Sequence, residues 1–214
     1  IGPALSQAAP IIVAVIDTGY TKFEAIPICK GGPKDFTGTG IHDAAPSSHG
    51  SNVVGLIAKY AGTTDYCIVP LKVFTSANGQ IQFNYRAYLR ALEYVNRTRP
   101  QFLNLSVSGF TSLKSEFDLI IKILDNGTIV IAASGNNKID LNKTGCIIYP
   151  ACTSPRVVMI ANSEGNSNIG TYIDAYENGD DQTAGGVTLS GSSQATAIHT
   201  GKLVRRAVKA QTGS

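Results

Sequence analysis

The residues that could perform nucleophilic catalysis are far apart in this sequence: Asp17, His49 and Ser193. A serine hydroxyl attacks a carbonyl when a base takes its proton, and histidine serves as that base when a carboxylate fixes its tautomer. Asn136 follows an apolar run and carries an amide that could donate to an oxyanion. Taken singly, Asp17 and Ser193 could be ordinary helix caps, so catalysis depends on a fold that brings these residues together.

Apolar runs alternate with helical patterns and predict where these residues lie. Strands are expected at 11–16, 26–29, 67–74, 102–109, 128–133 and 157–161, and helices from His49 onward and over 84–97, 115–126 and 195–208. The helix over 115–126 is expected to bury Phe117, Ile120, Ile121 and Leu124. Continuous β-branched runs are typical of strands buried on both faces, so we predict an α/β fold with a doubly wound, mainly parallel sheet flanked by helices.

In this arrangement each candidate residue lies at the end of an element. Asp17 follows the first strand, where open α/β sheets bind ligands. His49 and Ser193 each begin a helix, where unpaired backbone N–H groups and the helix dipole favour a developing negative charge.

The composition limits the classes to which the chain can belong. Of its 214 residues, 43% are hydrophobic and 15% charged, and no compositional break marks a linker, so we expect one domain over residues 1–214. A net charge of +3 is too small to indicate nucleic-acid binding, and no apolar run is long enough to span a membrane. The chain begins at Ile1, so we expect a processed chain whose targeting signal lies outside this sequence.

The four cysteines, Cys29, Cys67, Cys146 and Cys152, lack the spacing of a zinc site. Cys146 and Cys152 are close in sequence across a turn-like segment, whereas Cys29 and Cys67 would have to meet across strands. Two disulfides would indicate a secreted protein or another oxidising compartment, and four buried free thiols are the alternative.

Four segments, 12–19, 49–55, 132–136 and 191–196, resemble the signature blocks of subtilisin-like serine proteases, the subtilases. The order Asp, His, Ser along the chain is also the order in subtilisin, and segment 103–106 resembles the family's substrate-pairing strand. Each block alone is a weak signal. Four blocks in order, each at an element boundary and together covering most of the chain, make a strong one.

The resemblance implies a role for each matched residue. Asp17 would orient His49, which would be the general base and then the general acid, and Ser193 would be the nucleophile. Asn136 and the backbone N–H of Ser193 would form the oxyanion hole.

The resemblance also implies where substrate lies. Ser106, Val107 and Ser108, with Ser134 and Gly135, would line the cleft for the residue before the scissile bond. Ala77, Asn78 and Gly79 would form a second edge strand that grips the peptide. Ile148 falls where many relatives have Gly, so it would shorten the primary specificity pocket and favour small or medium side chains.

Several positions depart from the family pattern. Asn52 replaces a second His, away from the chemistry; Gln194 replaces the Met after the nucleophile; and Ala197 replaces a Pro. The abbreviated 59–66 loop falls where many relatives bind calcium, so calcium is possible but no metal site is predicted. Asp35, Asp43, Asp180 and Asp181 are expected to be solvated loop charges. Cys29 and Cys67 would fall on neighbouring strands in this family, where a disulfide is reasonable.

The resulting prediction is a serine endopeptidase that acts on proteins or peptides through an acyl-enzyme, without a cofactor. A propeptide, removed before the mature chain forms, is a further candidate partner. The alternative is a subtilase-fold protein that only processes itself or serves as a non-catalytic binding module. A lipase-like esterase is disfavoured, because the serine lacks the G-x-S-x-G motif and the order of the triad differs.

Overall fold

A parallel sheet forms the centre of the molecule in the computed structural model, which describes residues 10–23, 25–45, 47–63 and 65–213. Its strands are β1 (Ile11–Asp17), β2 (Lys34–Asp35), β3 (Tyr66–Lys72), β6 (Phe102–Leu105), β7 (Ile129–Ala133), β8 (Val158–Asn162) and β9 (Ala175–Glu177). Among the described residues these strands have the order β2-β3-β1-β6-β7-β8-β9, and all neighbours are parallel. The predicted parallel α/β sheet is confirmed.

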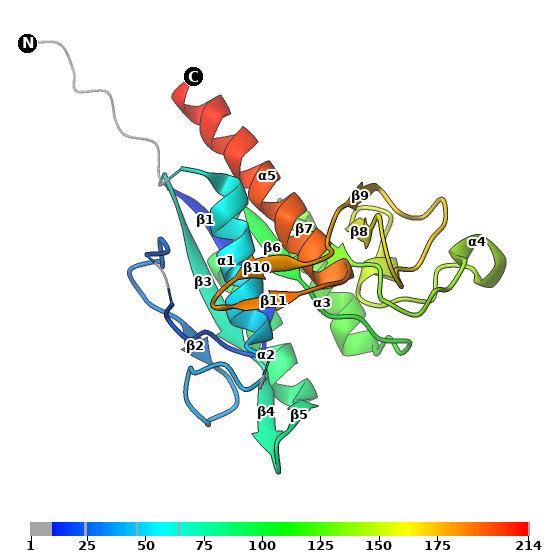
Figure 1. Cartoon of the computed structure of the whole chain (residues 1–214), viewed down its shortest axis with the longest axis horizontal. Helices are drawn as coiled ribbons and strands as arrows, with labels where there is room; N and C mark the ends of the chain where they lie inside the picture. The colour runs from blue at the N-terminus through cyan, green and yellow to red at the C-terminus, as the bar shows by residue number, and fades with distance from the viewer. Residues whose placement is uncertain (1–9, 24, 46, 64, 214) are drawn as a thin grey trace, which may run out of the picture.

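Helices cover both faces of this sheet. The helices are α1 (His49–Ala61), α2 (Tyr85–Thr98), α3 (Lys114–Asp125) and α5 (Ser192–Thr212). One apolar core joins Val13 and Val15 of β1 to α1 and α5, and the other joins Ala14 and Ile16 to α2 and α3. Because successive strand residues point to opposite faces, β1 contributes to both cores. Figure 1 shows α1 beside α5, at the same face of the sheet.

The strand order also locates a place for a site. The chain leaves β1 through β2 and β3 on one side and returns on the other side as β6. Such a reversal of strand order opens a crevice at the carboxyl ends of the strands, where open α/β sheets bind ligands. Asp17 ends β1, and Ser106 follows β6 at this edge.

Two hairpins and two short helical segments complete the described part of the chain. They are the hairpin of β4 (Phe74–Ala77) with β5 (Gln80–Phe83), the hairpin of β10 (Gln182–Ala184) with β11 (Val187–Leu189), α4 (Leu141–Thr144) and η1 (Ala151–Thr153). The β4–β5 hairpin projects from the body of the molecule in Figure 1.

The prediction that Ala77, Asn78 and Gly79 form an edge strand is wrong. Ala77 ends β4 and pairs with Gln80, and Asn78 and Gly79 have φ values of 52° and 75°. Two consecutive positive φ angles make the tight turn that Asn-Gly favours, so these two residues form the tip of a hairpin.

Two predicted strands and one helix face also need correction. Residues 26–29 make only an isolated bridge, from Ile28 to Ile68, since the segment is short and Pro27 has no N–H to donate. β6 ends at Leu105, so residues 106–109 lie outside the sheet. In α3 the buried residues are Glu116, Ile120 and Ile123, whereas Phe117 is 43% exposed.

The cysteines form two disulfides, Cys29–Cys67 and Cys146–Cys152, with Cα atoms 4.8 and 5.5 Å apart. The first joins the segment before β2 to β3, as the resemblance implied. No cysteine in the described part of the chain is free, so the free-thiol alternative is excluded. Among the described helices, none has the length and apolar character needed to cross a membrane.

Candidate active site

The carboxylate of Asp17 and the imidazole of His49 form a direct pair at the end of β1. Asp17 is 2% exposed, and its Oδ1 accepts hydrogen bonds from His49 Nδ1 at 2.8 Å and from the Thr18 N–H at 2.7 Å. Because a carboxylate only accepts, His49 carries its proton on Nδ1 when the ring is neutral. This tautomer leaves Nε2 as the basic nitrogen, which is what proton abstraction requires.

The electrostatic surroundings of His49 favour its protonated form. Burial on its own lowers the pKa of the imidazole, but the charge and hydrogen bond of Asp17, together with the charge of Asp43, outweigh burial and raise the pKa. The site therefore stabilises the imidazolium that forms when His49 takes a proton.

Asp43 is part of a network that fixes the start of α1. Its Oδ1 accepts from Thr18 Oγ1 at 2.6 Å, and its Oδ2 accepts from the N–H and the Oγ of Ser51, both at 2.8 Å. Thr18 Oγ1 in turn accepts from the Gly50 N–H at 2.9 Å. The network joins the residues after Asp17 to those after His49, so the expectation that Asp43 is a solvated loop charge is wrong.

Ser193 lies in the first turn of α5, and its neighbour Ser192 is 1% exposed. Ser193 Oγ donates to the Ser106 carbonyl at 3.0 Å, and Ser106 Oγ donates to the Ser193 carbonyl at 2.9 Å. Only Ser193 of the two serines reaches the surface, so it is the one whose hydroxyl a substrate could approach.

Two buried side chains hold Ser106 in this position. Asn104 of β6 donates from Nδ2 to Ser106 Oγ at 3.0 Å and accepts from Thr200 Oγ1 at 2.9 Å. Asn104 and Thr200 are both fully buried. They connect the central strand to α5.

Asn136 lies in the loop after β7, next to the start of α5. Its Oδ1 accepts from the Ser192 N–H at 2.8 Å, and its Nδ2 makes no hydrogen bond within the described part of the chain, so it remains available as a donor. A Cβ on Gly191, whose φ is 143°, would lie 3.1 Å from Asn136 Nδ2. Glycine is therefore required where this backbone passes Asn136.

Asn168 fixes the loop that carries Asn136. Its Nδ2 donates to the Ser134 carbonyl at 2.6 Å, and its Oδ1 accepts from the N–H groups of Asn137 and Ile139. A single Asn in a turn-rich segment gave no sequence signal for this role.

The departures Asn52 and Gln194 contact each other. Gln194 Nε2 donates to Asn52 Oδ1 at 3.1 Å, and both residues are at most 2% exposed. Asn52 Nδ2 also lies 3.0–3.2 Å from the carbonyls of Gln182, Ala184 and Val187. Asn52 therefore joins α1, the β10–β11 hairpin and the residue after Ser193, so it is closer to the site than its sequence position suggested.

Two hollows adjoin these residues. A cleft of about 530 Å³ is lined by His49 and by the predicted substrate-binding residues Ser106, Val107 and Ser108. A second hollow of about 300 Å³ is lined by Ser108, Gly109, Phe110, Asn136, Asn137 and Ile148. Of the residues predicted to line the primary specificity pocket, Ser108 and Ile148 lie in the wall of the second hollow, whereas Ser106 and Val107 line only the larger cleft.

Other predicted substrate-binding residues lie elsewhere. Ser134 and Gly135, which directly precede Asn136, are buried and line neither hollow. The hairpin contributes Ile81 and Phe83 to the larger cleft instead of Ala77, Asn78 and Gly79. An Asn-Gly turn flanked by apolar residues was the signal that could have identified this hairpin.

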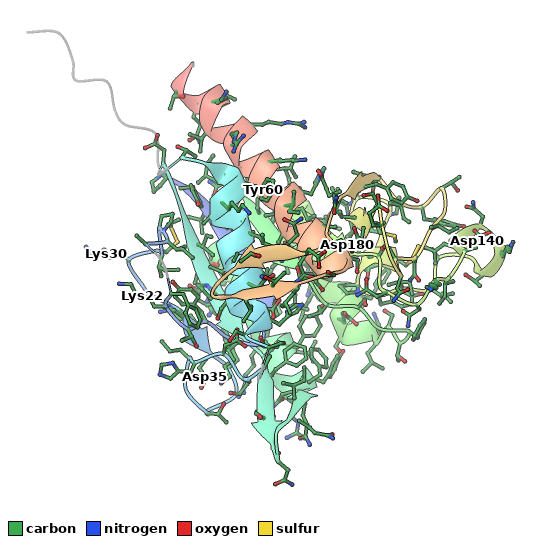
Figure 2. The ribbon with its side chains drawn as sticks, in the orientation of Figure 1. Lys22, Lys30, Asp35, Tyr60, Asp140 and Asp180 are labelled. Atoms are coloured by element: carbon green, nitrogen blue, oxygen red, sulfur yellow. A yellow bond between two sulfur atoms is a disulfide. The ribbon has the colours of Figure 1, made fainter. Side chains whose placement is uncertain are left out.

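The acidic residues considered for calcium do not form a cluster. Figure 2 shows Asp35 and Asp180 on either side of α1 in this view, and Asp180 Oδ1 accepts from Asn162 Nδ2 at 2.6 Å. Over the described ranges, no group of three or more His, Cys, Asp or Glu residues is placed to hold a metal ion.

The parallel sheet, its two helical layers and the Asp17–His49 pair at its carboxyl edge define an α/β protein of the subtilisin-like class. The chain belongs to the subtilase family, whose sequence model matches residues 9–206. It is 25% identical to subtilisin DY of Bacillus licheniformis over an alignment of 176 positions that covers 78% of this chain and 61% of the subtilisin. The chain thus spans less than two thirds of the length of that relative.

Solved structures share the fold. A lanthipeptide protease superposes with a TM-score of 0.75 at 16% identity, over 91% of this chain and 72% of the protease. A cold adapted subtilisin-like serine proteinase superposes with a TM-score of 0.73 at 21% identity, over 93% of this chain and 76% of the proteinase.

Proposed function

We propose that this protein is a serine endopeptidase with Asp17, His49 and Ser193 as its catalytic triad and Asn136 in its oxyanion hole. The observation that carries the proposal is the 2.8 Å bond between Asp17 and His49, at a cleft that the Ser193-bonded residue Ser106 also lines. Family membership supports the same conclusion.

The proposed reaction begins when Ser193 Oγ leaves the Ser106 carbonyl and donates to His49 Nε2. His49 takes the proton as Oγ attacks the scissile carbonyl, and Asp17 stabilises the resulting imidazolium. Asn136 Nδ2 and the Ser193 N–H donate to the oxyanion. His49 then protonates the leaving amine, which departs and leaves the acyl group on Ser193. His49 next takes a proton from water as the water attacks the acyl-enzyme, and it returns that proton to Ser193 Oγ as the acid product leaves.

We further propose that Ile148 restricts the size of the side chain accepted before the scissile bond. Its side chain is 1% exposed in the wall of the 300 Å³ hollow, so it limits the depth available to the residue before the scissile bond. Peptides with Ala at that position should be cleaved faster than peptides with Phe. Equal cleavage after Phe and Ala in a peptide library would contradict this expectation.

The proposed partners are protein or peptide substrates, together with a propeptide that is removed during maturation. The chain's own groups carry every step, so no cofactor is proposed. The two disulfides support secretion or another oxidising compartment.

Labelling with a fluorophosphonate probe tests the proposal. The folded wild-type protein should react, Ser193→Ala should not, and Ser163→Ala, which alters an exposed serine, should react like wild type. Absence of wild-type labelling would exclude the enzyme. Labelling without cleavage of any added peptide would favour the self-processing alternative.

A further inference from the structure

Glu116 is a buried carboxylate beside the larger cleft that the proposed reaction does not use. It is 5% exposed, lies in the first turn of α3 and forms part of the lining of the 530 Å³ cleft. Within the described ranges it has no Lys, Arg or His at ion-pair distance; Lys114 of the same helix pairs with Asp118 instead. A buried carboxylate without a basic partner is unusual, because burial strongly disfavours the charged form.

The hydrogen bonds of Glu116 offset only part of the free-energy cost of burying its charge. Tyr88 OH donates to its Oε1 at 2.9 Å, and the Leu113 N–H also donates to the carboxylate. Burial nevertheless raises the pKa of Glu116, with these two hydrogen bonds opposing the shift. A cation brought into the cleft would favour the charged carboxylate and gain from the contact.

The walls around Glu116 suit a long cationic side chain. The cleft has aromatic residues from several segments: Phe74, Phe83, Tyr85, Tyr88, Phe110 and Tyr149. The Phe83 ring lies 5.3 Å from that of Tyr88 and 5.1 Å from that of Phe74. Aromatic faces attract ammonium and guanidinium groups, and they also cover the apolar stem of lysine or arginine.

The position of the cleft indicates which part of a substrate would enter it. His49 and Ser106 connect it to the reacting atoms, and the separate hollow at Ile148 is assigned to the residue before the scissile bond. Side chains of an extended peptide alternate in direction, so the second and fourth residues before that bond point away from the Ile148 hollow.

We propose that this cleft binds the basic side chain of a substrate residue, the second or fourth before the scissile bond, with Glu116 as its counter-ion. The inference rests on the proposed endopeptidase function and names the substrate class of the same site.

A peptide series on wild-type protein tests the inference directly. Lysine, acetyl-lysine and norleucine are placed in turn at each of the four positions before the scissile bond. At the second or fourth position, lysine should raise kcat/KM at least about tenfold over both uncharged analogues, the size of one charge-assisted hydrogen bond. Equal or faster cleavage of the uncharged peptides at both positions would overturn the inference while leaving the endopeptidase in place; no cleavage of any peptide would overturn both.

Two variants distinguish a direct contact with Glu116 from a general effect of negative charge on α3. Glu116→Gln keeps an acceptor for Tyr88 but loses the charge, so the ratio of kcat/KM for lysine over norleucine should fall at least about tenfold. Asp118→Asn removes an exposed charge from the same helix outside the cleft and should leave that ratio at its wild-type value. An equal ratio in wild type and Glu116→Gln would overturn the inference, and the wild-type series decides it if Glu116→Gln fails to fold.

Discussion

Among single residues, Asn52 has a connecting role that no sequence pattern indicated. Its amide connects α1 to Gln194 and to three carbonyls of the β10–β11 segment. Asn52, Gln194 and Ala184 are buried, whereas Gln182 and Val187 are partly exposed. Asn52→Ala would leave these groups unpaired, so we expect the free energy of unfolding to fall by about 2–4 kcal/mol. Urea unfolding followed by circular dichroism measures this change.

The control for this prediction is Asn166→Ala, which alters an exposed asparagine whose side chain makes no hydrogen bond within the described residues. Its free energy of unfolding should stay within about 0.5 kcal/mol of wild type. If both variants unfold at the same urea concentration as wild type, the connecting role assigned to Asn52 is wrong.

The charge of Asp43 should be visible in the pH dependence of cleavage. In the proposed mechanism neutral His49 is the active base, and Asp43 contributes to the rise in the His49 pKa. Activity should therefore be lost as the pH falls through this raised pKa, and Asp43→Asn should shift the acidic limb of the kcat/KM profile to lower pH. The measurement is a kcat/KM profile for each protein, with Asp125→Asn, which alters an exposed carboxylate, as control. A shift of the Asp43→Asn limb to higher pH would contradict the argument.

At this scale the sequence identified the proposed catalytic residues but not the residues whose hydrogen bonds fix the surrounding loops. Asp17, His49 and Asn136 lie at element ends and within short motifs, so their positions could be predicted. Asp43 and Asn168 act through hydrogen bonds that form only in the folded chain. Their backbone partners are 8 residues away for Asp43 and 31 residues away for Asn168. No local pattern could have indicated them.

At the scale of elements, α1, which begins at His49, packs against α5, which carries Ser193 in its first turn. A Cβ at Gly201 would lie 2.7 Å from the Ile57 carbonyl and 2.8 Å from Tyr60 Cβ. Gly201→Ala must therefore separate the helices, and we expect a loss of about 1–3 kcal/mol in unfolding free energy together with a lower kcat. Thermal unfolding and peptide cleavage measure the two effects.

Arg206→Ala provides the matched control, because it truncates an exposed residue of the same helix. Its stability and kcat should remain close to those of wild type. Unchanged stability and kcat in Gly201→Ala would show that this contact does not position the proposed catalytic groups.

Strands and helices were predictable where the apolar pattern was long. β1 and α2 agree with their predicted ranges to within one residue, since each is continuous and buried along one or both faces. The short hairpins and β9 were missed, because strands of three or four residues show too little periodicity. The predicted strand over 102–109 was too long at its polar end, because β6 ends at Leu105 and residues 106–108 line the cleft instead of pairing in the sheet.

At the scale of the whole molecule, the disulfides constrain very different lengths of chain. Cys29–Cys67 closes a loop with a sequence separation of 38, whereas Cys146–Cys152 closes one of 6. In the chain-entropy account, a crosslink stabilises by restricting the unfolded state, by about 4 kcal/mol for the longer loop and about 2 kcal/mol for the shorter. Stability should therefore depend more on the first bond than on the second.

The comparison uses two double variants, Cys29→Ser with Cys67→Ser and Cys146→Ser with Cys152→Ser, each unfolded in urea beside wild type. The first pair should lose more free energy of unfolding than the second, by about 1–2 kcal/mol. Cys29 and Cys67 line neither hollow, so cleavage by the folded fraction should persist in the first variant. Cys146 and Cys152 flank Ile148 and Tyr149, which line the hollows, so circular dichroism, rather than cleavage, shows whether the second variant keeps its native state. A larger loss in the second pair would mean that native packing around Cys146 and Cys152, rather than restriction of the unfolded chain, is what those bonds contribute.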